Sequence, residues 1–267
     1  CYEKPIICFG TGFVMGGGLG LLAGASHRVV TETTKIAMPE ITIGLFPDVG
    51  ATHFLNQIPF NIGYFLALTG ARINGNDALF CKLANYSIEQ NNISNFMTAL
   101  QKSSWEQGIE SNHLLVDDLL KSHAPQDCTI LPASNIVENL EVLESVCQQN
   151  SLCDTLNAIY QIDNDNKWLK HAKFTSAAGS PLSSLLIYEQ LRRHRYADLQ
   201  TVFKSELSLA TNIIRHSEFA EGVRALLIDK DKQPKWQFEH YSHVPNSLIE
   251  MFFTQPWEAN PLNKLLN

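Results

Sequence analysis

The pattern of apolar and polar residues changes along the chain near residue 87. Before this point, short apolar runs are separated by glycine and proline, a pattern typical of buried strands and tight turns. After it, glycine becomes rarer and apolar residues recur at spacings of three and four, which indicates amphipathic helices. We therefore predict an α/β first part followed by an all-helical part, with boundaries at residues 1–86, 87–179 and 180–267.

In the first part, apolar runs and turn residues define the expected elements. Asn61 precedes one apolar segment and Gly70 follows it, as expected for the N-terminal cap and the end of a helix. Asp77 begins a second helical pattern, whereas proline and glycine between residues 39 and 50 indicate an irregular loop. The expected strands cover residues 5–9, 28–31 and 35–37, and the expected helices cover residues 19–25, 62–69 and 77–83.

The helical part carries apolar faces at helical spacing. Pro181 suits the first turn of one helix, where a missing backbone N–H is harmless. The polar residues 163–166 predict a turn between helices. The faces consist of Ile136, Leu140, Leu143 and Cys147; of Leu185, Leu186, Tyr188 and Leu191; and of Leu207, Leu209, Ile213 and Ile214.

Charge and cysteine content limit the partners and the compartment. The net charge of -7 argues against nucleic acid, because proteins that neutralise phosphates usually carry an excess of Lys and Arg. Six scattered cysteines without CxxC spacing favour reduced core thiols of a cytoplasmic protein over disulfides. His240 and His243 are close in sequence but lack further ligands nearby, so we expect them at the surface and expect no metal site.

The uncharged stretch from Pro5 to Ser26 has the length of a membrane span. It contains seven glycines, which make a lipid-facing helix unfavourable, so we expect a buried strand, turn and helix and no membrane contact. No signal peptide is recognisable, and the chain enters a strand almost directly after Cys1. We therefore expect a fragment or a processed chain.

Three interpretations compete for the glycines from Gly16 to Gly20. The first is close packing, because glycine lets a helix approach a sheet. The second is a dinucleotide-binding turn, since residues 18–23 match G-x-G-x-x-A, but Glu40 then lies in a loop and not at a strand end. The third is an oxyanion hole, because amides at the start of a helix lack backbone partners and can stabilise the oxygen of an attacked thioester.

Several separated segments form a recognisable set. They are residues 12–20 (GFVMGGGLG), 37–40 (AMPE), 43–50 (IGLFPDVG), 64–70 (YFLALTG), 180–181 (SP), 221–225 (EGVRA), 228–231 (IDKD) and 234–236 (PKW). In this order they resemble the crotonase superfamily, in the form found in its 3-hydroxyisobutyryl-CoA hydrolase branch. The similarity spans most of the chain and is weakest between Ser87 and Lys173.

The resemblance implies a crotonase-like ββα spiral core, present in part, followed by an all-helical C-terminal region. Hydratases of the superfamily hold water with two glutamates. One of them corresponds to Glu40, but the position of the other is Gly20, which has no side chain. The hydrolase branch has acids at the positions of Glu40 and Asp48. Glu40 would then attack the thioester or activate water. The turn of Gly16 and Gly17 would bind the oxyanion through the Gly17 amide.

The resemblance also gives Asp48 a role, either to bind the 3-hydroxyl of the acyl group or to position water. From the residues alone, plainer interpretations stay open. Glu40 would be a solvated loop acid, and Asp48 would form a turn before Val49 and Gly50.

Basic residues gather in two places. Lys230, Lys232 and Lys235 are compatible with contact to coenzyme A phosphates and equally with a solvated lysine face. The charge run of Arg192, Arg193 and Arg195 is expected to be solvated.

The leading hypothesis is hydrolysis of a short-chain hydroxyacyl-CoA thioester, above all 3-hydroxyisobutyryl-CoA in valine breakdown. We expect this reaction to need no cofactor, because coenzyme A is part of the substrate. An enoyl-CoA hydratase or isomerase is the alternative if another acid replaces Gly20, and a non-catalytic CoA-binding or assembly module is the third. The resemblance implies a homo-oligomer, a trimer or hexamer. It also places the second oxyanion amide before Cys1, so we expect the isolated chain to be inactive or poorly soluble.

Overall fold

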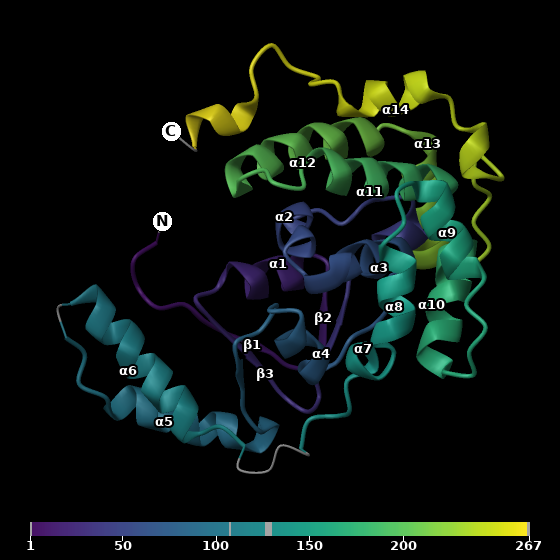
Figure 1. Cartoon of the computed structure of the whole chain (residues 1–267). Coiled ribbons are helices and arrows are strands. Elements are labelled where there is room, and N and C mark those ends of the chain that lie inside the picture. Colours follow the sequence, from purple (N-terminus) through teal and green to yellow (C-terminus); the bar gives the residue numbers. More distant parts are fainter. Residues whose placement is uncertain (1, 107, 126–129, 266–267) are drawn as a thin grey trace. The chain divides into compact units, whose positions relative to one another are not determined.

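The computed structural model describes residues 2–106, 108–125 and 130–265 of the chain (Figure 1). The chain forms two compact units. The first consists of Cys1–Ala37 and Arg72–Asn139, and the second of Met38–Ala71 and Leu140–Asn267. The three-part division at residues 86 and 179 stays a prediction.

Parallel strands form the basis of the first unit. β1 (Ile7–Gly10), β3 (His27–Val30) and β5 (Tyr86–Ser87) make a sheet in the order β1-β3-β5. β2 (Phe13–Met15) pairs with β4 (Lys35–Ala37) in a second parallel sheet. The sequence predicts β1, β3 and β4 but not β2, because three residues between glycines give no local strand pattern and the pairing with β4 is tertiary.

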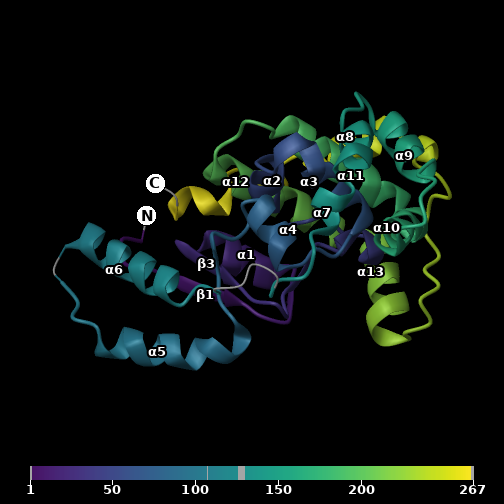
Figure 2. The ribbon, with the colours of Figure 1, turned by 60° about the horizontal axis from the view of Figure 1, so that its bottom comes forward.

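The described residues of the first unit form five helices, and α5 and α6 both pack on the larger sheet. α5 and α6 lie side by side (Figures 1 and 2). Phe96 of α5 and Val116 of α6 are fully buried against Val29 of β3. Burying each such side chain contributes about 1.5–3 kcal/mol. The helices are α1 (Gly17–Gly24), α4 (Gly75–Phe80), α5 (Ile93–Lys102), α6 (Ile109–Ser122) and α7 (Asn135–Glu138), with a 3₁₀ turn at Gln90–Asn92.

The start of α4 differs from the sequence prediction. The helix begins at Gly75 and not at Asp77, and Asn74 is its N-terminal cap: its side chain accepts the Asp77 N–H, and Asp77 accepts the Asn74 N–H in return. Asp77 is fully buried and also accepts hydrogen bonds from Ser134 Oγ and the Ile136 amide. This acid therefore joins the segment around α7 to α4, which local sequence does not reveal.

In the second unit, α3 (Ile62–Thr69) is the central helix. Most of its residues are buried, as expected for a helix that is apolar on all sides. It packs against α2 (Ala51–Asn56), α8 (Leu140–Cys147), α10 (Lys167–Ala178) and α11 (Pro181–Arg193). The other helices are α9 (Leu152–Tyr160), α12 (Leu199–Ile213), α13 (Ser217–Val223), the π-helical turn Arg224–Ile228 and α14 (Asn246–Phe253), with 3₁₀ turns at Glu40–Ile43, Pro59–Asn61, Tyr241–His243 and Pro261–Lys264.

Two predictions about helix ends need correction. Asn61 precedes α3 but makes no capping bond, because its Oδ1 accepts a hydrogen bond from Arg195. The face from Ile136 to Cys147 belongs to two helices, α7 and α8, separated at Asn139. The Asn139 side chain donates to the Asn135 carbonyl, a local bond that competes with helix continuation. Gly70 ends α3 in the left-handed conformation, as predicted.

α11 and α12 occupy the segments predicted for them, and α14 packs on α12 (Figure 1). Pro181 is the first residue of α11, as predicted. Ile214 lies one residue beyond α12 and is 56% exposed, so the predicted apolar face is wrong at this position.

The described thiols differ in exposure. Cys81 and Cys147 are buried, as predicted, and burial raises the pKa of the Cys147 thiol to about 12. Cys153 is exposed, so the prediction of a core thiol is wrong there. Cys1 and Cys128 lie outside the described residues.

The arginine run is not simply solvated. Arg192 and Arg193 both pair with Glu189 on the same helix, and Arg193 also pairs with Glu250 of α14. Arg193 in addition lies over the ring of Phe253. These contacts fasten α14 to the end of α11.

Candidate active site

The glycine turn lies in the first unit, between β2 and α1. Gly16 is the residue before the helix, with φ 49°, and its carbonyl accepts the Leu19 and Gly20 amides. A Cβ added to Gly17 or Gly18 would meet no described atom within 4 Å. Close packing therefore does not explain these two glycines. The turn leaves open space at the start of an eight-residue helix, where free amides favour negative charge.

Glu40 lies in the second unit and begins the 3₁₀ turn after Pro39. Its side chain is buried, with 6% exposure, and Oε2 has no hydrogen-bond partner in the described part of the chain. Burial raises the pKa of Glu40 to about 8, and the charge of nearby Asp48 adds to this rise. The interpretation of Glu40 as a solvated loop acid is therefore wrong.

Glycines bring two backbones close together around the Glu40 turn. A Cβ on Gly222 of α13 would lie 2.2 Å from the Ile43 carbonyl carbon. Gly44, with φ 69°, would place a Cβ 2.5 Å from the Glu218 carbonyl oxygen. The IGLF and EGVRA segments therefore meet directly, and each requires glycine at the contact.

Ser180 fixes the same turn from another side. Its backbone N–H donates to the Ile41 carbonyl at 3.0 Å, and its hydroxyl caps α11 at the Ser183 amide. The hydroxyl also donates to Glu218 Oε1 at 3.0 Å, so α11 and α13 are joined beside the turn. Ser180-Pro181 and the EGVRA segment thus hold the backbone that carries Glu40.

Asp48 lies in a strained turn before α2. Val49 has φ 57° and Gly50 has φ 83°, so two consecutive residues are left-handed. This conformation is unfavourable for a β-branched residue such as valine. Asp48 is partly buried, and burial raises the pKa of its carboxyl group. Both predicted acids belong to the second unit, and the charge of Asp48 contributes to the raised pKa of Glu40.

A third acid, Glu206 of α12, meets the same turn and is not predicted from the sequence. Its Oε2 accepts the Gly50 amide at 2.7 Å, and its Oε1 accepts the Thr52 amide at 3.0 Å. The side chain is 3% exposed, and burial, together with the charge of Asp48, raises its pKa to about 6. The available signal is the spacing of Val202, Glu206, Leu209 and Ile213, which puts this acid on the buried face of α12.

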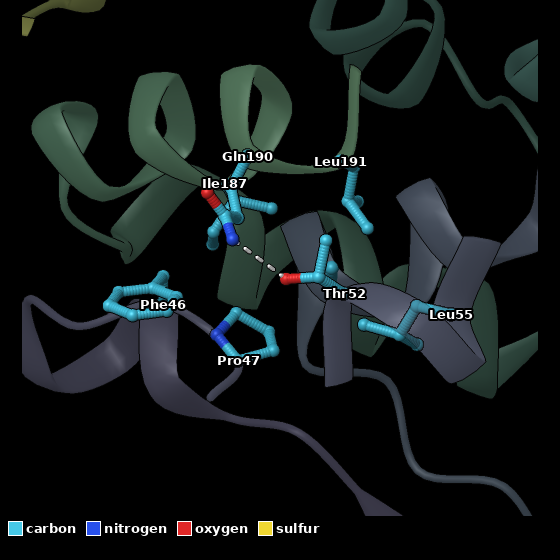
Figure 3. A pocket seen from close by; sticks show the side chains of 8 residues that line it. Phe46, Pro47, Thr52, Leu55, Ile187, Gln190 and Leu191 are labelled. Atoms are coloured by element: carbon cyan, nitrogen blue, oxygen red, sulfur yellow. Dashed lines mark hydrogen bonds between the residues drawn. The ribbon is translucent and has the colours of Figure 1, made fainter. Parts of the chain in front are cut away.

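Polar side chains continue this contact beside a small apolar pocket (Figure 3). Figure 3 shows Gln190 of α11 directed at Thr52 of α2, with Pro47, the residue before Asp48, close by. Gln190 Nε2 donates to Thr52 Oγ1 at 3.2 Å, and Ser205 Oγ donates to Gln190 Oε1 at 3.1 Å. The Asp48 turn is therefore supported by α2, α11 and α12.

The predicted lysine cluster is exposed and mixed with acids. Lys230 and Lys232 are left-handed, and the Lys235 amide donates to Glu221 Oε1 at 2.7 Å. Arg224, in the same segment, bonds to Glu221 at 2.8 Å, and its guanidinium group lowers the pKa of that acid to about 2. The same guanidinium group bonds to Asp229 at 2.6 Å and to Asp231 at 2.7 Å. Contact of the lysines with coenzyme A stays a prediction.

Metal ligands and membrane-spanning helices were the other features that composition left to be decided in the described part of the chain. No group of three His, Cys, Asp or Glu side chains suited to a metal ion occurs among residues 2–106, 108–125 and 130–265. Among the same residues, no helix has the length and apolar character needed to cross a membrane.

A family model matches nearly the whole chain. The model of the enoyl-CoA hydratase/isomerase family matches residues 1–253. The chain therefore belongs to the enoyl-CoA hydratase/isomerase family, that is, to the crotonase superfamily.

Curated relatives resemble the chain over nearly all of its length. The "3-hydroxyisobutyryl-CoA hydrolase, mitochondrial" of Dictyostelium discoideum is 32% identical, over 91% of this chain and 62% of that protein. The proteins of the same name from Xenopus tropicalis and Gallus gallus are 33% and 34% identical, over 95% and 94% of this chain and 64% of each relative. The chain thus spans somewhat less than two thirds of the length of these relatives.

Solved structures confirm the crotonase fold. A carnitinyl-CoA dehydratase from Mycobacterium thermoresistibile matches with a TM-score of 0.82 and 30% identity, over 97% of this chain and 70% of that one. An enoyl-CoA hydratase from Rhodobacter sphaeroides matches with a TM-score of 0.79 and 28% identity, over 95% and 69%.

Proposed function

We propose that the protein hydrolyses a short-chain hydroxyacyl-CoA thioester, with 3-hydroxyisobutyryl-CoA of valine breakdown as the first candidate. The observation that carries this proposal is Glu40, a buried acid without a hydrogen-bond partner for Oε2 among the described residues, whose pKa is raised further by the charge of Asp48. The hydrolases named above support it. The position of the other hydratase acid is Gly20, which offers no carboxylate.

In this proposal, Glu40 acts at the carbonyl carbon of the thioester. As a carboxylate it either attacks this carbon directly or removes a proton from the attacking water. The C–S bond then breaks, and the sulfur leaves as the thiolate of coenzyme A. After direct attack the acyl group is left as an anhydride on Glu40, and water hydrolyses this anhydride to the free hydroxy acid and the Glu40 carboxylate. The amide of Gly17, beside Gly16, would stabilise the oxyanion formed before the bond breaks.

The remaining parts of the proposal concern the substrate and the state of the protein. Asp48 binds the 3-hydroxyl or positions water, and no cofactor is needed, because coenzyme A belongs to the substrate. Lys230, Lys232 and Lys235 would contact its phosphates. We propose a homo-oligomer, a trimer or hexamer. For the compartment, composition favours the cytoplasm, whereas the relatives are named mitochondrial.

Hydration of an enoyl-CoA is the second candidate, favoured by the similarity to a carnitinyl-CoA dehydratase and an enoyl-CoA hydratase. The two reactions give different products, so the protein should be supplied with 3-hydroxyisobutyryl-CoA and, separately, with crotonyl-CoA. We expect free thiol from the first substrate and no loss of the enoyl absorbance with the second. Hydration without thiol release would instead support a hydratase, and binding of both without turnover would support a non-catalytic module.

The rate of hydrolysis should depend on pH through Glu40. Because the pKa of Glu40 is raised to about 8, most of this group is protonated at pH 7 and cannot act as a nucleophile or base. We expect kcat/KM to rise about a hundredfold from pH 6 to a plateau above pH 8. Thiol release measured in steps of half a pH unit checks this, and a profile that is flat over this range would contradict a role for ionised Glu40.

A further inference from the structure

The turn that carries Asp48 does not hold its shape through its own backbone alone. Val49 and Gly50 are both left-handed, with φ 57° and 83°, and valine disfavours this region. Within the turn, the Ala51 amide donates to the Asp48 carbonyl at 2.9 Å. The neighbouring amides of Gly50 and Thr52 donate to Glu206, 154 or more residues away in sequence. The backbone conformation that orients the Asp48 side chain therefore depends on a contact from α12.

Apolar side chains of the same helix reinforce this contact. A Cβ on Gly50 would lie 3.2 Å from the ring of Phe203 and 3.3 Å from a methyl group of Leu199. Because α12 covers the turn on this side, the carboxylate of Glu206 is shielded from water, and both of its oxygens are used by backbone amides.

We propose that Glu206 is a positioning residue that directs Asp48 and thereby gives the enzyme its selectivity for acyl groups with a 3-hydroxyl. This inference rests on the proposed hydrolase function and on the role proposed there for Asp48. Glu206 itself does not touch the reacting atoms, since its two oxygens are occupied by the amides of Gly50 and Thr52.

A purely structural cap would not require a carboxylate here. Ser, Thr or Asn at the usual capping position, or another neutral amide, satisfies helix amides without placing a second negative charge beside Asp48. At Glu206 the buried charge is opposed by desolvation and by Asp48. A carboxylate instead can accept hydrogen bonds from the Gly50 and Thr52 amides at the same time, and this fixes the position of Asp48, two residues before Gly50.

The test compares 3-hydroxyisobutyryl-CoA with isobutyryl-CoA, which lacks only the 3-hydroxyl. In Glu206→Gln, the side-chain NH₂ must face one of the two backbone N–H groups, so the turn loses a hydrogen bond while volume is kept. We expect kcat/KM for the hydroxylated substrate to fall at least tenfold and that for isobutyryl-CoA to fall less than threefold. Ser208→Ala, which removes a buried hydroxyl from the same helix, is the matched control and should leave the ratio unchanged.

A double-mutant comparison separates positioning from loss of stability. With Asp48→Asn already present, Glu206→Gln should change the substrate ratio less than twofold further. Equal losses on both substrates, or an unchanged ratio in Glu206→Gln, would overturn the inference. If Glu206→Gln does not fold, Glu206→Asp, which keeps the charge but reaches one amide at most, should show a smaller change in the same direction.

Amide hydrogen exchange provides a readout that does not need turnover. In Glu206→Gln, the amide that loses its acceptor, Gly50 or Thr52, should exchange at least tenfold faster than in the native protein, while amides of α9 keep their rates. If the native protein hydrolyses neither thioester, the proposed function fails and this measurement still decides whether Glu206 holds the turn. Unchanged exchange at both amides would show that it does not.

Discussion

Replacing Glu40 by glutamine should lower kcat for thioester hydrolysis by a factor of about 1,000 to 100,000. Glutamine keeps the volume of the buried side chain but can neither attack a carbonyl carbon as a carboxylate nor remove a proton from water. Since both proposed roles of Glu40 need an ionised carboxylate, the loss is expected whichever role applies. Thiol release from 3-hydroxyisobutyryl-CoA at pH 8, where about half of the native Glu40 is ionised, measures it.

The fold of this variant must be shown to be intact. The pKa of Glu40 in the folded protein, about 8, lies above its ordinary value of 4.5, so the folded state binds this proton more tightly than the unfolded state. The free energy of unfolding of the native protein therefore falls as the pH rises from about 5 to 8. Glu40→Gln has no ionisable group at this position and does not lose this stability. At pH 8, Glu40→Gln should unfold at the same temperature as the native protein or at a higher one.

A matched control is available in the same 3₁₀ turn. Thr42 donates its hydroxyl to the Pro39 carbonyl at 2.7 Å and carries no charge. Thr42→Val removes this hydrogen bond and should keep kcat within about threefold of native. Uncharged substitutions of partly exposed residues usually have small effects. If Glu40→Gln instead retains more than a tenth of the native rate, Glu40 does not carry the reaction. If no measurable behaviour changes at all, a non-catalytic module becomes the better description.

Sequence identifies the segments of this site well because their backbones are unusual. Gly44 and Gly222 lie where two segments of the backbone come into contact, and Ser180 lies where α11 begins against the Glu40 turn. Each is therefore marked by a residue type that nothing else replaces easily. What the sequence does not give is the pairing of these segments, since Ile43 and Gly222 are far apart along the chain.

Residues whose role depends on tertiary contact are the ones that sequence reasoning misses. Glu206 is a charged residue on a helix, and the plainest expectation for it is solvent exposure. Only the packing of α12 on the Asp48 turn makes it buried and doubly bonded. β2 is missed for a related reason, because its three residues become a strand only by pairing with β4. Local patterns predict elements, whereas burial of a polar group follows from their assembly.

Placing a methyl group on Gly222 should strongly destabilise the protein. In an isolated helix, alanine is better than glycine by about 1 kcal/mol. Here, however, the new Cβ would lie 2.2 Å from the Ile43 carbonyl carbon and 2.3 Å from its oxygen. The turn that contains Ile43 is also held from another side, because the Ser180 amide donates to the Ile41 carbonyl at 3.0 Å. We expect Gly222→Ala to lower the free energy of unfolding by at least about 4 kcal/mol.

Urea denaturation of Gly222→Ala beside Gly24→Ala tests this expectation. A Cβ on Gly24, at the end of α1, would meet no described atom within 4 Å, so this variant should match or slightly exceed native stability. Because the clash pushes on the turn that carries Glu40, any folded Gly222→Ala should also lose hydrolysis beyond what its unfolded fraction explains. Native-like stability of Gly222→Ala would mean that α13 and the Glu40 turn are not in contact. In that case the convergence of the family segments on Glu40, which connects the sequence pattern to the proposed chemistry, would have to be abandoned.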